Sequence, residues 1–128
     1  YVDGTDRLNA LINRSKYFVF PSELEGMSMM LLEAGSIGTP MICSDIPQNQ
    51  AVLGSEEVLY FKSKNVDDLA EKLVWAFEHP SEMNRLAEKT QASIRQNYLI
   101  SKVVGQYAAL YDQMRTSVPT ELTKSYSK

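Results

Sequence analysis

Residues 17–44 read YFVFPSELEGMSMMLLEAGSIGTPMICS, and this stretch decides the fold. Its two ends, residues 17–20 and 41–44, are short apolar runs without polar alternation, as is typical of strands covered on both faces. Between them, residues 28–37 favour a helix, and the sequence Gly38-Thr39-Pro40 ends it. The order of strand, helix and strand predicts two neighbouring strands of a parallel sheet in an α/β fold.

The flanking sequence continues the same alternation. We expect a helix from a capping Thr5 to just before Lys16, a third strand at residues 58–61 and an amphipathic helix over residues 65–79. Residues 45–57 are polar and predict an irregular segment with one helical turn near residues 51–53. These elements predict one domain over residues 1–115, with part of its sheet missing at the amino end, and a polar tail over residues 116–128.

Two further helices are expected to start at Ser81 and Ser101. Each has apolar residues at helical spacing, which predicts a buried stripe on each helix. The stripes comprise Met83, Leu86, Ala87 and Thr90 in the first helix and Val104, Tyr107, Ala108 and Tyr111 in the second.

Composition limits the classes of protein to which this chain can belong. Its 128 residues, 44% hydrophobic and 23% charged, fit one globular domain. The net charge of -3 leaves no long basic stripe, which argues against a nucleic-acid partner. The single cysteine, Cys43, excludes a disulfide framework or a cysteine-rich zinc cluster and fits a reducing cytosol. We expect Cys43 to pack in the interior, Trp75 to be a core or interface residue, and His79 to be a capping or surface residue.

The segment between the first strand and the following helix has the features of an anion site. Ligands of open α/β sheets bind at the carboxyl ends of the strands. Gly26 would let a ligand approach the backbone closely, and the free amides around Met27, Ser28 and Met29 would face an anion at the start of the helix. This arrangement predicts a seat for a diphosphate.

Two carboxylates bracket this seat. Glu25 precedes the helix and Glu33 lies eight positions later. At about 1.5 Å of rise per residue they would be roughly 12 Å apart, comparable to the distance from a hexose across a diphosphate to a ribose. Carboxylates accept hydrogen bonds from sugar hydroxyl groups. The alternative is that both are ordinary surface residues, although the apolar neighbours of Glu33 predict that it is partly buried.

The residues Pro21-Ser22, Glu25-Gly26, Glu33-Ala34 and Gly38-Thr39-Pro40 together resemble the donor-site signature of glycosyltransferase family 4. That family has the GT-B fold of two Rossmann-like domains. The resemblance covers roughly residues 1–115 and implies most of a carboxyl-terminal domain, a Rossmann-like three-layer fold around a parallel sheet.

The resemblance also implies roles for individual residues. Glu25 would be the catalytic residue that contacts the donor sugar, Glu33 would bind the ribose hydroxyls, and Ser22 would lie at the strand end. The backbone from Gly26 through Met27 and Ser28 to Met29 would touch the sugar and the diphosphate.

This sequence departs from the family pattern in three places. Gln48 and Gln50 stand where many relatives have a glycine and a glutamate, and Gly35-Ser36 replaces a methionine-alanine pair. An arginine, a lysine and a histidine that relatives supply come from segments outside this chain, so we expect this chain alone to transfer no sugar.

The resulting hypothesis is a retaining hexosyltransferase without a metal or other cofactor. It would use a nucleoside diphosphate sugar as donor and a glycan or lipid-linked acceptor held by an amino-terminal domain. We expect it in the cytoplasm, or peripheral to the inner face of a membrane in the full-length enzyme. The alternative is a non-catalytic nucleotide-binding or assembly module. GT-B phosphorylases and epimerases rank third, because they share the architecture but should show different motifs.

Overall fold

The structure is a computed structural model that describes residues 3–117. They fall into two units, one ending at Gln96 and the other beginning at Asn97. Each unit is described by itself below.

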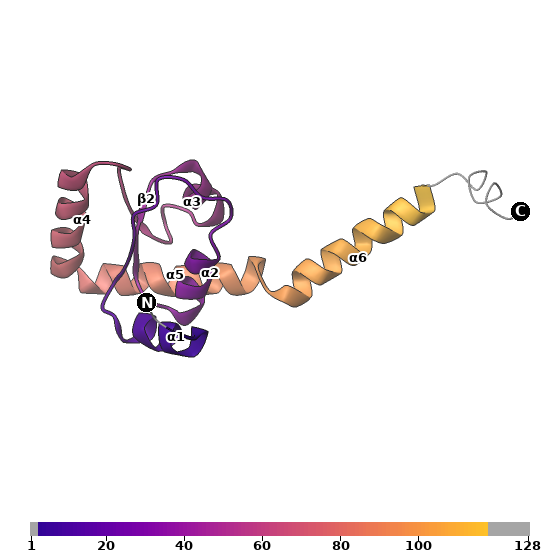
Figure 1. Ribbon diagram of the computed structural model, residues 1–128, viewed down its shortest axis with the longest axis horizontal. Helices are drawn as coiled ribbons and strands as arrows, with labels where there is room; N and C mark the ends of the chain where they lie inside the picture. Colours follow the sequence, from indigo (N-terminus) through magenta and orange to yellow (C-terminus); the bar gives the residue numbers. More distant parts are fainter. Residues whose placement is uncertain (1–2, 118–128) are drawn as a thin grey trace, which may run out of the picture. The chain divides into compact units, whose positions relative to one another are not determined.

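The first unit contains three parallel strands and the helices around them (Figure 1). Its elements are α1 (Thr5–Arg14), β1 (Phe18–Phe20), α2 (Met29–Ile37), β2 (Met41–Ser44), α3 (Pro47–Val52), β3 (Leu59–Phe61), α4 (Val66–Glu78) and α5 (Pro80–Asn97). The strand order is β1-β2-β3, with Phe18 opposite Met41 and Cys43 opposite Tyr60. The predicted parallel α/β sheet is therefore confirmed, with each strand within one residue of its expected position.

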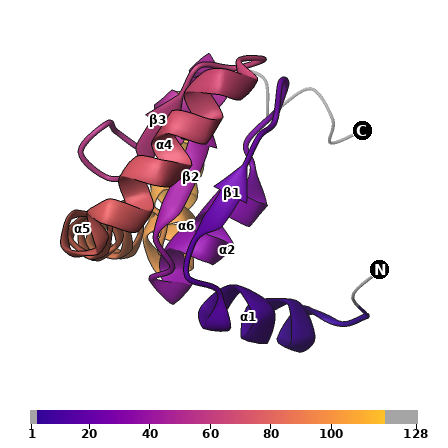
Figure 2. The same ribbon diagram turned by 90° about the vertical axis from the view of Figure 1, so that its left-hand side faces the viewer.

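The strands lie between two layers of helices. Figure 2 shows α4 on one side of the strands and α1 and α2 on the other. All four residues of β2 are buried, as expected for the central strand of a sheet covered on both faces. A core cluster joins the sheet to α4 and α5 through Ile42, Phe61, Ala76 and Met83.

Local sequence explains where the helices begin and end. Helix α2 stops at Gly38, whose φ of 89° is left-handed and favours glycine. Helix α4 starts after Asn65, whose side chain accepts a 2.9 Å hydrogen bond from the Asp68 amide. It ends at His79, just before Pro80 begins α5.

Several helices start at positions that differ from the predictions. The residue before α1 is Gly4 and no side chain caps the helix, so Thr5 is its first residue rather than its cap. The segment expected to be irregular contains α3, which starts at Pro47 because proline suits the first turn of a helix. The last two helices begin at Pro80 and Ile100, one residue before the serines that were expected to start them.

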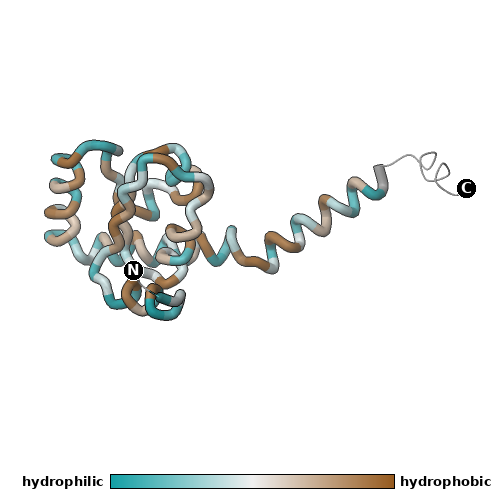
Figure 3. The backbone as a smooth tube through the Cα atoms, viewed as in Figure 1, coloured by the Kyte–Doolittle hydropathy of each residue, from teal (hydrophilic) through white to brown (hydrophobic). Residues whose placement is uncertain are grey.

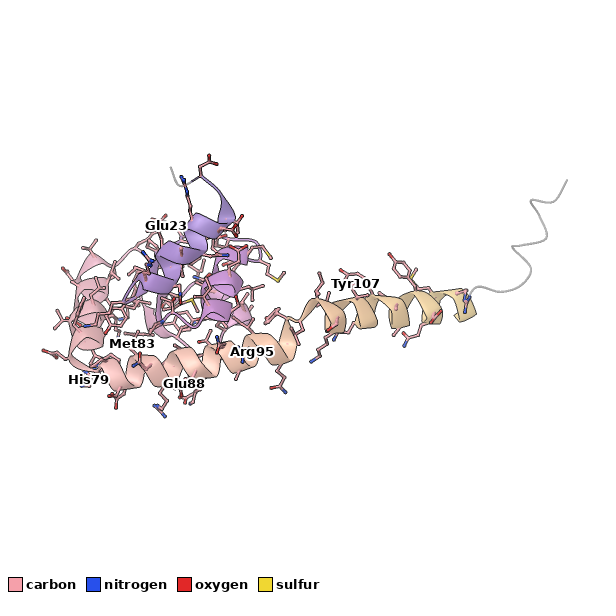
Figure 4. The ribbon with its side chains drawn as sticks, turned by 90° about the horizontal axis from the view of Figure 1, so that it is seen from below. Glu23, His79, Met83, Glu88, Arg95 and Tyr107 are labelled. Carbon is pink, nitrogen blue, oxygen red and sulfur yellow. The ribbon has the colours of Figure 1, made fainter. Side chains whose placement is uncertain are left out.

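Helix α5 packs against the rest of the first unit along one face. Its buried residues include Met83, Ala87 and Thr90, as predicted, and Leu86 is half-buried. Figure 4 shows Met83 on the side of α5 that faces the rest of the unit, whereas Glu88 points away. The contact with α2 is close at Gly35, where an added Cβ would lie 2.4 Å from Ile94 Cδ1 and 2.7 Å from Thr90 Cγ2.

The second unit contains α6 (Ile100–Ser117). Hydrophobic residues recur along this helix (Figure 3). Val104, Tyr107 and Tyr111 are exposed within this unit, so the burial of its stripe stays a prediction. Among the residues that the structure describes, this unit has no second helix or strand that could cover the stripe. Most of the expected polar tail lies outside the described residues.

Candidate functional site

The candidate site starts where β1 ends. Ser22 follows the strand by two residues, and its hydroxyl donates a 2.6 Å hydrogen bond to Oε1 of Glu25. Both side chains are half-buried. The structure thus brings together two of the residues that the sequence singled out, and it restricts the Glu25 side chain while leaving Oε2 without a hydrogen bond or ion pair to the described residues.

A second layer of polar groups lies beneath Ser22. The hydroxyl of Ser44, the last residue of β2, donates a 2.5 Å hydrogen bond to the backbone carbonyl of Ser22. The side-chain Nδ2 of Asn49, in α3, donates to the Ser44 carbonyl at 3.0 Å and to the Ser44 hydroxyl at 3.1 Å. Ser44 and Asn49 are each 1% exposed. We call this set, Asn49, Ser44, Ser22 and Glu25, the strand-end network.

The start of α2 lies three residues beyond Glu25. Ser28 precedes the helix and makes no side-chain cap. The first amides of any helix have no acceptor within that helix, and those of α2 also lack a side-chain cap. They carry the positive end of the helix dipole. Ser28 is buried, whereas Met27 and Met29 are exposed. A Cβ at Gly26 would meet nothing within 4 Å in the described chain, so the space beside this backbone is open.

Glu33 lies in the second turn of α2 between two fully buried residues, Leu31 and Ala34. It is half-buried, which confirms that part of the prediction. Its carboxylate makes no hydrogen bond or ion pair within residues 3–117. The expected separation of about 12 Å from Glu25 remains a prediction.

Sequence reasoning missed Ser44 and Asn49. The predicted strand did end at Ser44, but neither residue was considered for a role at the site. Their signal in the sequence is weak: a serine that ends an apolar strand and an asparagine two positions after Pro47.

Other polar residues near the site have a less clear place in it. Gln50, in the same segment as Asn49, is exposed and Gln48 is half-buried. Glu23, labelled in Figure 4, forms a 3.2 Å ion pair with Lys64, but both side chains are exposed and such pairs contribute little.

The other singled-out residues have structural roles. Burial raises the pKa of the Cys43 thiol to about 12, so it remains protonated at neutral pH and is no nucleophile. His79 ends α4, where its Nδ1 lies 2.8 Å from the Trp75 carbonyl and its ring stacks on that of Trp75. Trp75 itself packs against the core cluster, as predicted.

Within the part of the chain that the structure describes, no three His, Cys, Asp or Glu side chains gather as metal ligands. None of the described helices combines the length and apolar character needed to cross a bilayer.

The sequence model of the family "Glycosyl transferases group 1" matches residues 1–93. This range covers the first unit almost completely, including every residue of the strand-end network. The chain therefore belongs to the group 1 glycosyl transferases.

Individual relatives agree with this assignment. The O-antigen biosynthesis glycosyltransferase WclY of Escherichia coli is 26% identical over 116 residues, 89% of this chain and 31% of that protein. A second relative is the N,N'-diacetylbacillosaminyl-diphospho-undecaprenol alpha-1,3-N-acetylgalactosaminyltransferase of Campylobacter jejuni. It is 29% identical over 119 residues, which are 92% of this chain and 31% of that protein. This chain thus spans about a third of the length of these relatives.

A solved structure extends the comparison to the fold. HepE of Anabaena, determined in complex with UDP, superposes with a TM-score of 0.75 at 15% identity and covers 80% of this chain and 29% of HepE. At this identity the likeness establishes the fold alone. It supports the interpretation of the first unit as part of a Rossmann-like domain of the GT-B type.

Proposed function

We propose that this chain is the donor-binding part of an enzyme that transfers a hexose from a nucleoside diphosphate sugar to a glycan or lipid-linked acceptor. The single observation that carries the proposal is the strand-end network. It holds Glu25 at the carboxyl end of a parallel sheet, where ligands of such folds bind, and directly before the free amides of α2.

Three parts of a nucleotide sugar, the hexose, the diphosphate and the ribose, have a matching group in this arrangement. The free Oε2 of Glu25 can accept a hydrogen bond from a hydroxyl of the donor hexose. The amides at the start of α2, next to the open backbone of Gly26, suit the diphosphate and would stabilise charge on it as it leaves. Glu33, which has no partner in the described chain, would accept hydrogen bonds from the ribose hydroxyls.

The proposed reaction is a transfer with retention of configuration. The bond between the anomeric carbon and the diphosphate breaks, and a bond to an acceptor hydroxyl forms on the same face. The acceptor proton leaves with the diphosphate. We propose no enzymic nucleophile in this chain, whose role is to position the donor, and no metal ion. The relatives named above include one whose name contains a diphospho-undecaprenol-linked sugar, which supports a lipid-linked acceptor.

A transfer assay on the intact enzyme that contains this chain tests the proposal. UDP-, GDP- and dTDP-linked hexoses would be offered with glycan and polyprenyl-diphosphate-linked acceptors, and nucleoside diphosphate release would be measured. We expect acceptor-dependent release from at least one donor, and the product should have the anomeric configuration of the donor by NMR. Binding of a nucleotide without any transfer would favour the non-catalytic module, and inversion would contradict the retaining mechanism.

A further inference from the structure

We infer that Ser44 and Asn49 are positioning residues that hold Glu25 in its binding orientation through the strand-end network. The inference rests on the proposed function, because it assigns to these two buried residues a part in sugar transfer. They contact neither the proposed sugar nor the diphosphate, and their effect would pass through Ser22.

The chemistry of the four groups gives the network one direction. An amide Nδ2 can only donate, so the Ser44 hydroxyl accepts from Asn49 and keeps its own hydrogen for the Ser22 carbonyl. The same Ser22 then donates its side-chain hydrogen to Glu25 Oε1. The Ser44 bond therefore holds the Ser22 backbone, and the Ser22 side chain in turn holds Glu25, whose carboxylate is the final acceptor.

Burial makes the network difficult to replace by water. Asn49 and Ser44 are each 1% exposed, and the Ser22–Glu25 pair is partly buried. If one of the deep groups were removed, solvent could not readily reach its partner. The Ser22 carbonyl would lose its donor, and the backbone that carries both Ser22 and the following loop would lose its connection to β2.

Helix α3 shows how the network is anchored. It has six residues, and the buried one is Asn49. The Asn49 side chain thus connects α3 to the end of β2, and Ser44 connects β2 to the end of β1. Because the network joins three elements, the loop that carries Ser22 and Glu25 is fixed relative to the sheet.

The expected consequence is a loss of turnover without a loss of nucleotide affinity. A catalytic group displaced by about 1 Å can lower a rate roughly 100-fold. We therefore expect Ser44→Ala to lower kcat roughly 10- to 100-fold in the intact enzyme and Asn49→Ala to act in the same direction with a smaller factor. Affinity for the free nucleoside diphosphate should remain within about twofold, since its proposed contacts are on α2.

The chain offers a matched control at the other end of β2. Thr39 is 4% exposed, and its hydroxyl donates a 2.9 Å hydrogen bond to the Ile12 carbonyl. Thr39→Val removes a buried hydroxyl of the same kind but does not touch the network. Both Thr39→Val and Ser44→Ala should lower the Tm, whereas only Ser44→Ala should lower kcat.

A double-mutant cycle with Glu25→Ala separates positioning from general destabilisation. If Ser44 acts through Glu25, Ser44→Ala should have almost no further effect on kcat once Glu25 is alanine, whereas Thr39→Val should have the same effect in either background. An equal loss from Ser44→Ala with and without the Glu25 carboxylate would overturn the inference.

Crystal structures of this chain as wild type and as Ser44→Ala provide a test that does not depend on activity. We expect the Glu25 carboxylate to leave the Ser22 hydroxyl in the variant, and an unchanged Ser22–Glu25 hydrogen bond would overturn the inference. If the intact enzyme transferred no hexose from any donor, the proposed function would fail. The crystal structures would still decide whether Ser44 positions Glu25.

Discussion

At the amino end of the sheet, buried hydroxyl groups join one element to another, whereas at the carboxyl end they lead to a half-exposed carboxylate. Thr39 bonds to the last turn of α1, and Thr90 of α5 bonds to the Glu57 carbonyl just before β3. Ser44 and Ser22 instead form a path to Glu25. The difference supports our proposal that the carboxyl end of the sheet forms the binding site, whereas the hydroxyl groups at the amino end stabilise the fold.

The largest effect is expected at the amino end, from Gly35→Val. The new side chain would overlap Thr90 and Ile94, which are themselves buried. Overpacking of this kind costs about 1–3 kcal/mol, which exceeds the few tenths of a kcal/mol, roughly, that valine gains over glycine in helix propensity. Urea unfolding followed by circular dichroism should show a lower midpoint.

Gly105→Ala is the control for this experiment. A Cβ at Gly105 in α6 meets nothing within 4 Å among the described residues, so the change should not destabilise the chain. If Gly35→Val left the unfolding midpoint unchanged, the contact between α2 and α5 would not support the fold as we describe.

An effect of comparable size is expected from Glu33→Ala at the carboxyl end. Losing a hydrogen bond to a charged group costs ~1.5–3 kcal/mol, which corresponds to roughly ten- to 150-fold in affinity. Calorimetry on the intact enzyme should show this loss for the free nucleoside diphosphate as well as for the sugar donor. Glu88→Ala removes an exposed glutamate from α5 and should bind both ligands like the wild type.

Glu25→Ala should lower turnover while leaving affinity for the free nucleoside diphosphate almost unchanged. Its proposed partner is the donor sugar near the transition state, so the free nucleoside diphosphate should bind almost as before while kcat falls. Glu23→Ala, two residues away, removes an exposed carboxylate paired with Lys64 and should affect neither quantity. Equal losses of nucleotide affinity in the Glu25 and Glu33 variants would contradict the division of roles between them.

Chelation should have no effect. The proposed site uses amides and carboxylates rather than a metal ion to hold the donor, so excess EDTA should leave the initial rate of the intact enzyme unchanged. Loss of activity that magnesium or manganese restores would contradict a metal-independent site and would also remove the proposed contrast between the two ends of the sheet.

The sequence by itself determined the three strands and every helix except α3. Apolar runs without alternation marked the three strands, and helix formers followed by Gly38 or Pro80 marked helix ends, because these signals are local and depend on neighbouring residues. The pairing of Ser22 with Glu25 is also local, since three positions separate them. The α/β class and the parallel sheet therefore followed from the sequence. The Ser22–Glu25 hydrogen bond was not predicted, and the place of the candidate site stays a prediction.

The tertiary structure alone decided which residues support that site. Ser44 lies 22 positions from Ser22, and Asn49 is in a helix that was expected to be an irregular loop. Burial of a stripe is likewise settled by what packs on it: α5 and α6 each have 18 residues and an apolar stripe, yet only that of α5 is covered in the described structure. Periodicity shows that a helix has an apolar face, but only the presence of a neighbouring element can remove that face from water.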